Sequence, residues 1–82
     1  MLEQERRVEE ARAAIDLGDR PAFHVLTSWD GSAIDVRIRE LPLVHVFVPD
    51  DGRVLDGAHE LIARTLGVDA GSFDVQLAPA SG

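Results

Sequence analysis

Histidine and aspartate are the side chains in this sequence that could hold a metal ion or transfer a proton. The three histidines, His24, His45 and His59, fall on different expected elements without the spacing of metal ligands, and the chain has no cysteine. Asp35 could supply one carboxylate to a two-metal reaction, but Asp74 alternates away from the core and cannot match it. Phosphate loops, nucleophile elbows and nucleotide fingerprints are also absent from the sequence. We therefore predict that the protein is not an enzyme and has no catalytic residues, metal ligands or cofactor.

Aromatic and acidic side chains offer a surface for binding another protein instead. Trp29 precedes Asp30-Gly31-Ser32, which is typical of a hairpin turn, and an exposed tryptophan is a favoured anchor in protein interfaces. Trp29 could equally cap one end of the core. The expected partner-binding residues lie on the exposed face of the sheet and in its turns: Trp29, Asp30, Asp35, Glu40, Asp50 and Asp51.

The charge balance favours a basic partner over a nucleic acid. The chain has 82 residues, with 15 acidic against 8 basic side chains and a formal net charge of -7. Binding to a polyanion requires clustered basic residues, and the arginines here are scattered. An acidic surface suits a basic protein, although acidity alone could also serve only solubility. No signal peptide or membrane-spanning run is visible, so we expect a cytoplasmic protein with no membrane partner.

The segment from Arg53 to Leu66 is the helix that we expect to organise the domain. Its apolar residues recur at helical spacing along one stripe, and Gly67 follows as a left-handed stop. An N-terminal helix is expected from Leu2 to Leu17. Its apolar stripe is narrow, so this helix could pack along a sheet edge, pack against a second copy of the chain or lie on the surface. The stripe consists of Val8, Ala11, Ile15 and Leu2.

Period-two patterns predict four strands around the organising helix. The first runs from Ala22 to Trp29, and the second is the clear alternation from Ile34 to Ile38. The run from Leu43 to Val48 is almost entirely apolar, which fits a strand covered on both faces or one at a dimer seam. Phe73 to Leu77 closes the set.

The expected fold is therefore α+β, with an N-terminal helix followed by a β-β-β-α-β unit. Its four-stranded sheet is mainly antiparallel and packs on one helix. We assign residues 1–20 to the N-terminal helix and its turn, and residues 21–82 to the βββαβ domain. Because this much apolar strand exceeds what one helix can cover, we also expect a homodimer.

Three stretches resemble the N-terminal domain of HicB-family antitoxins: WDGSAIDVRIRELP at 29–42, RVLDGAHELIARTLG at 53–67 and VDAGSFDVQLAP at 68–79. The resemblance covers about residues 23–79 and implies a partial ribonuclease-H-like fold without nuclease activity. It also implies a partner, because HicB-family proteins oppose a small, mRNA-cleaving HicA toxin. Leu43 stands where the family usually has a glycine after Leu-Pro.

Two functions from different classes follow from these observations. The first is an antitoxin-like protein-binding module that neutralises a small basic ribonuclease toxin by covering it. The alternative is a structural or adaptor dimerisation domain of a larger complex, without a toxin partner. A neighbouring open reading frame for a short, basic, histidine-containing protein would favour the first.

Overall fold

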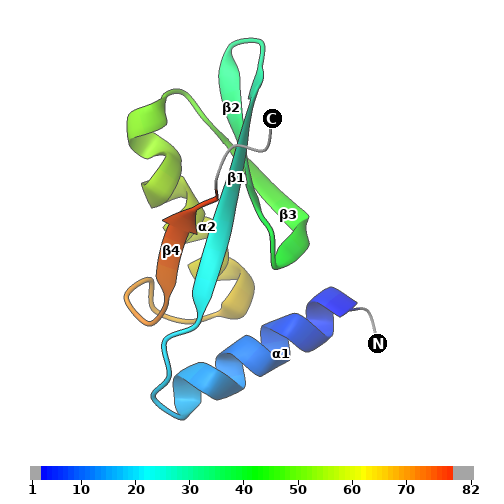
Figure 1. Cartoon of the computed structure of the whole chain (residues 1–82), viewed down its shortest axis with the longest axis vertical. Helices are drawn as coiled ribbons and strands as arrows, with labels where there is room; N and C mark the ends of the chain where they lie inside the picture. The colour runs from blue at the N-terminus through cyan, green and yellow to red at the C-terminus, as the bar shows by residue number, and fades with distance from the viewer. Residues whose placement is uncertain (1–2, 79–82) are drawn as a thin grey trace.

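The computed structural model describes residues 3–78, which form two long helices and a four-stranded sheet (Figure 1). The α+β class and the expected order of elements are confirmed. The elements in chain order are α1 (Glu3–Asp16), β1 (Ala22–Asp30), β2 (Ala33–Ile38), β3 (Leu41–Val48), the 3₁₀ helix η1 (Asp51–Arg53), α2 (Val54–Leu66) and β4 (Asp74–Leu77). The expected first helical residue, Leu2, lies outside the described residues.

The sheet has the strand order β3-β2-β1-β4. The pairs β1–β2 and β2–β3 are antiparallel, which confirms a mainly antiparallel sheet, whereas β4 runs parallel to β1. A parallel pair needs a crossover connection. Here α2 crosses one face of the sheet and returns the chain from the β3 edge to the opposite edge (Figure 1).

The core lies between α2 and the sheet face that it covers. The alternation of β2 places Ile34, Val36 and Ile38 on this face, where each is at most 1% exposed. Helix α2 contributes buried residues at four-residue spacing, and Gly67 ends it at φ 71° as the sequence predicts. A Cβ atom on Gly57 would lie 2.8 Å from Val48 Cγ1, so this glycine lets α2 approach β3 closely.

Helix α1 lies across the end of the sheet at which β1 begins (Figure 1). Its stripe of Val8, Ala11 and Ile15 packs against the core, although no described residue of α1 is fully buried. The side chain of Gln4 accepts a 2.6 Å hydrogen bond from the backbone N–H of Leu43 on β3. The helix therefore contacts an edge strand as well as α2.

Strand β3 differs from the expectation in its extent and in its cover. It begins at Leu41 and includes Pro42, which is tolerated because β3 is an edge strand. The interpretation that both faces of this strand are covered within the chain is wrong. Leu43 and Phe47 are 66% and 50% exposed on the face away from α2.

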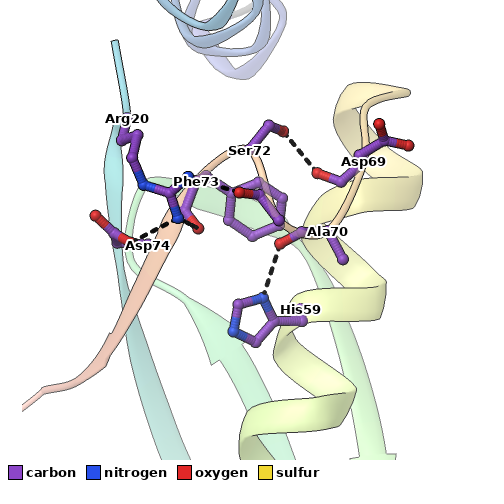
Figure 2. Close-up of polar contacts among 8 residues, drawn as sticks. Arg20, His59, Asp69, Ala70, Ser72, Phe73 and Asp74 are labelled. Carbon is purple, nitrogen blue, oxygen red and sulfur yellow. Dashed lines mark hydrogen bonds and ion pairs between the residues drawn. The ribbon is translucent and has the colours of Figure 1, made fainter. Parts of the chain in front are cut away.

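Two side chains hold the loop before β4 in place (Figure 2). The guanidinium of Arg20 donates to the carbonyl oxygens of Gly71 and Phe73, and also bonds to the Asp74 carboxylate at 3.0 Å. The His59 ring on α2 stacks on the buried Phe73 ring with centroids 5.5 Å apart, and its Nδ1 lies 3.2 Å from the Ala70 carbonyl oxygen. These contacts fix the position at which β4 joins β1.

Candidate protein-binding surface

Four of the expected binding residues gather at one end of the sheet, which we call the acidic end: Trp29, Asp30, Asp50 and Asp51. Trp29 pairs with Ile34 on β2, and Ile34 pairs with Val48 at the end of β3. Trp29 therefore lies two strand spacings, or roughly 10 Å, from the point at which the chain enters Pro49. The turn after β1 and the turn after β3 thus lie toward the same end of the molecule (Figure 1).

The acidic end is accessible to a partner. Trp29 is 64% exposed, so it does not cap the core. Asp30, Asp50 and Asp51 are all exposed as well. Asp50 precedes η1, and its side chain makes no capping hydrogen bond there. The carboxylates are therefore available to cationic groups around a large aromatic side chain.

Asp35 is placed differently, although it points away from the Ile34, Val36 and Ile38 face as predicted. It is only 7% exposed, because it lies in a ring of its own chain's side chains. Its Oδ2 accepts a 2.8 Å hydrogen bond from Arg37 Nε, and its Oδ1 lies 3.0 Å from His45 Nδ1. Burial alone would raise the pKa of Asp35, but the hydrogen bonds and charges of Arg37 and His45 lower it. The Asp35 carboxylate is thus already occupied.

Glu40 lies at the opposite end of the sheet from the acidic end, in the β2–β3 turn. Its Oε1 accepts a 2.9 Å bond from the backbone N–H of His24, and its Oε2 lies 2.7 Å from His24 Nδ1. Burial raises the pKa of Glu40, and the hydrogen bonds from His24 outweigh this effect and lower it. Glu40 therefore fastens β1 to the turn.

The sheet face away from α2, which we call the open face, shows a feature that the site prediction missed. Cross-strand rows on this face run Leu26–Arg37–His45 and Ser28–Asp35–Phe47. Leu26 is 41% exposed, and the His45 and Phe47 rings meet edge to face with centroids 5.4 Å apart. Leu26 and Phe47 thus flank the contacts that Asp35 makes with Arg37 and His45. The sequence signal was present, because β1 and β3 both carry apolar residues on both of their faces.

The three histidines are engaged separately within the chain. Each histidine bonds to a separate partner: His24 to Glu40, His45 to Asp35, and His59 to the Ala70 carbonyl. Within residues 3–78, no group of three or more histidine, cysteine, aspartate or glutamate side chains could hold a metal ion. Exposed acids beside an exposed tryptophan suit a cationic protein surface.

No helix among residues 3–78 is long and apolar enough to cross a membrane. Comparisons of the chain with protein-family models, with curated proteins and with solved structures found no match. The acidic end and the open face are therefore identified only from the geometry of this chain.

Proposed function

We propose that this protein is an antitoxin-like binding module that neutralises a small basic ribonuclease by covering it. The observation that carries the proposal is the acidic end, where the 64% exposed Trp29 lies at the same end of the sheet as Asp30, Asp50 and Asp51. A rigid aromatic anchor with a charged rim is the arrangement found at binding hot spots.

The two kinds of side chain would serve different steps of binding. The chain carries a net charge of -7, so long-range attraction would raise the rate at which a basic partner arrives. Trp29 would then slow dissociation, either by filling a pocket or by receiving an arginine or lysine on its ring. The acidic surface would also repel RNA, the substrate of such a partner.

The order of the elements supports the same function. The chain from β1 to β4 has three strands, a helix and a fourth strand, as the resemblance to the HicB family implies. A HicA-like toxin acts on messenger RNA, so the proposed function requires the cytoplasm. In this proposal Asp35 and Glu40 act indirectly: Asp35 holds β2 to β3, and Glu40 holds β1 to the turn between them.

The test is co-expression with the product of the neighbouring open reading frame, followed by growth measurement and binding by surface plasmon resonance. Trp29→Ala should weaken the complex by about 30-fold, which corresponds to the ~2 kcal/mol typical of a hot spot, mainly through faster dissociation. An Asp30, Asp50 and Asp51 triple asparagine variant should slow association, and this effect should fade as salt rises.

The matched control changes three exposed acids on α1 to their amides: Glu5, Glu9 and Asp16. It removes the same charge from a distant surface, so it should slow association less than the acidic-end variant does. Equal effects of the two triple variants would show that only net charge matters and would refute the acidic end as the interface. A neighbouring product that does not inhibit growth would remove the antitoxin function.

One observation favours the alternative, a structural or adaptor domain. The open face carries Leu26, Leu43 and Phe47 at 41%, 66% and 50% exposure, and no element among residues 3–78 covers it. Such a face could pack in a larger assembly. Binding that depends on Leu26 and ignores Trp29 would select this function.

A further inference from the structure

Strand β3 presents an outer edge that is unprotected from Val44 to Val48. It is the last strand of the sheet on its side, and no strand within residues 3–78 pairs with its outer edge. Edge strands of monomers are usually protected by lysine or other charged residues, or by bulges that twist the edge away. The straight stretch from Val44 to Val48 has none of these, and His45 is its only titratable residue. An edge of this kind is suited to pairing with another strand.

The hydrogen-bond pattern shows which backbone groups this edge offers. The N–H of Arg39 donates to the carbonyl of His24, so Arg39 and every second residue before it on β2 point toward β1. Ile34 and Val36 therefore bond to β3, through their partners Val48 and Val46. The intervening residues of β3 direct their N–H and C=O groups outward. These residues are His45 and Phe47.

A groove beside this edge can receive the side chains of an added strand. It has a volume of about 380 Å³ and lies between β3 and α2, with Val46, Gly57 and Leu61 in its lining. Two arginines and two acids, Arg53, Arg64, Asp56 and Glu60, also line it. The groove is thus electrically balanced on a chain whose net charge is -7. This is a place where two acidic molecules can meet without strong repulsion.

We propose that a second copy of this chain fills the groove by pairing its own β3 antiparallel with this one, centred on Val46. This inference does not depend on the proposed partner. The register places His45 opposite Phe47 of the second copy, and the reverse, so every free backbone group of these residues is bonded. Val46 faces Val46 of the second copy above the groove. The two sheets become one continuous sheet.

Neighbouring registers leave more backbone groups of the two β3 strands without a hydrogen-bond partner. Centring the pair on His45 would place Phe47 opposite Leu43, whose N–H is already bonded to Gln4. Centring it on Phe47 would place His45 opposite Pro49, which has no N–H to donate. The register centred on Val46 is the one that avoids both losses.

Charge separation supports the same register. Antiparallel pairing centred on Val46 points the two acidic ends in opposite directions, with Asp50 opposite Pro42 of the second copy. The two Asp50 residues would lie eight residues apart along the strands, or about 26 Å. This separation exceeds the screening length of about 8 Å at physiological ionic strength, so the acidic ends do not oppose pairing.

The absence of cysteine from the sequence allows a clean cross-linking test of the full-length protein. In the proposed register, Val46→Cys places two thiols on directly opposite residues with Cα atoms about 4.5 Å apart, within the range for a disulfide. Phe47→Cys is the matched control on the same strand. Its side chain is more exposed, but its two copies would lie about 8 Å apart, beyond that range.

Under mild oxidation, Val46→Cys should therefore form a covalent dimer at least about tenfold faster than Phe47→Cys. The unmodified protein should show twice the 8.9 kDa chain mass by light scattering at micromolar concentration. Faster cross-linking of Phe47→Cys, or a mass of 8.9 kDa for the unmodified protein, would overturn the proposal.

A proline substitution separates edge pairing from the other possible contacts. Phe47→Pro removes an N–H that β2 does not use, so the variant should fold and become monomeric. Phe47→Ala keeps this N–H and should remain largely dimeric. A dimer that survives Phe47→Pro but is lost in Leu26→Lys would assign the contact to the open face and refute edge pairing. If Phe47→Pro does not melt cooperatively, the relative cross-linking rates of Val46→Cys and Phe47→Cys test edge pairing instead.

Discussion

Replacing Asp35 with asparagine should destabilise the protein at neutral pH and much less in acid. The substitution keeps the shape of the side chain but removes the charge, and it leaves one oxygen to face two donors, Arg37 Nε and His45 Nδ1. Loss of a charge-assisted hydrogen bond costs about 1.5–3 kcal/mol. The partners Arg37 and His45 are 56% and 43% exposed, so water can solvate them and reduce this cost. We expect a loss of about 1–2 kcal/mol at pH 7.

The pH dependence follows from the direction of the pKa shift. The pKa of Asp35 is lower in the folded protein than in the unfolded chain, because Arg37 and His45 stabilise its charged form. The stabilisation is therefore complete above the unfolded value and is lost as the pH falls through the folded value. The difference in the free energy of unfolding between the original protein and Asp35→Asn should be largest at pH 7 and smaller at pH 3.

Urea unfolding followed by circular dichroism measures this difference, with protein concentration held fixed because dimerisation would add to the apparent stability. A double-mutant cycle with Arg37→Gln separates the energy of the Asp35–Arg37 contact from that of the Asp35–His45 contact. Equal urea midpoints for the original protein and Asp35→Asn at pH 7 would refute the structural role of the contacts that Asp35 makes with Arg37 and His45. A deficit that is undiminished at pH 3 would show that it arises from packing instead.

Two other substitutions test the core and the loop before β4. Ile62→Asp should abolish cooperative thermal unfolding, because it places an unpaired charge where the isoleucine is 0% exposed, whereas Leu55→Asp on the same helix replaces a 44% exposed residue and should fold. Cooperative melting of Ile62→Asp would show that the buried face of α2 is misassigned. Arg20→Ala should lower stability by about 1 kcal/mol and expose the amides of β4 to hydrogen exchange, because it removes the bonds to Gly71 and Phe73. Protection of β4 unchanged from that of the original protein would refute the role of Arg20.

The two elements with an unambiguous period were predictable almost to the residue. In β2 the apolar residues alternate with charged ones, so one face of the strand is fixed as the core face. In α2 the apolar stripe and Gly67 define both the buried face and the end. Strand β3 was harder, because a continuous apolar run does not indicate which face is covered or that the strand lies at an edge. The parallel direction of β4 also depends on the crossover and not on its own residues.

The candidate site was predictable where it depends on chain connectivity and not where it depends on register. The acidic end forms because alternate turns of antiparallel strands lie at the same end of a sheet, and the residue pattern located both turns. The contact between Glu40 and His24 joins residues 16 apart, and its presence depends on how β1 pairs with β2. Asp35 and Arg37 did carry a signal, since residues two apart on a strand share a face. That signal indicates contact, but burial of Asp35 also requires His45 and Phe47 from β3.

The acidic end and the β3 edge can act independently because they face different directions. The edge offers its backbone groups sideways, in the plane of the sheet, through His45 and Phe47, whereas Trp29 lies at the end of the strands. Antiparallel pairing of β3 leaves both acidic ends free at opposite ends of the continuous sheet. A dimer of this kind would bind two basic partners without contact between them. A monomeric Phe47→Pro variant would then keep the affinity of one acidic end and form a 1:1 complex in place of a 2:2 complex. Because the affinity for the partner and the mass of the complex change separately, failure of either proposal can be recognised without failure of the other.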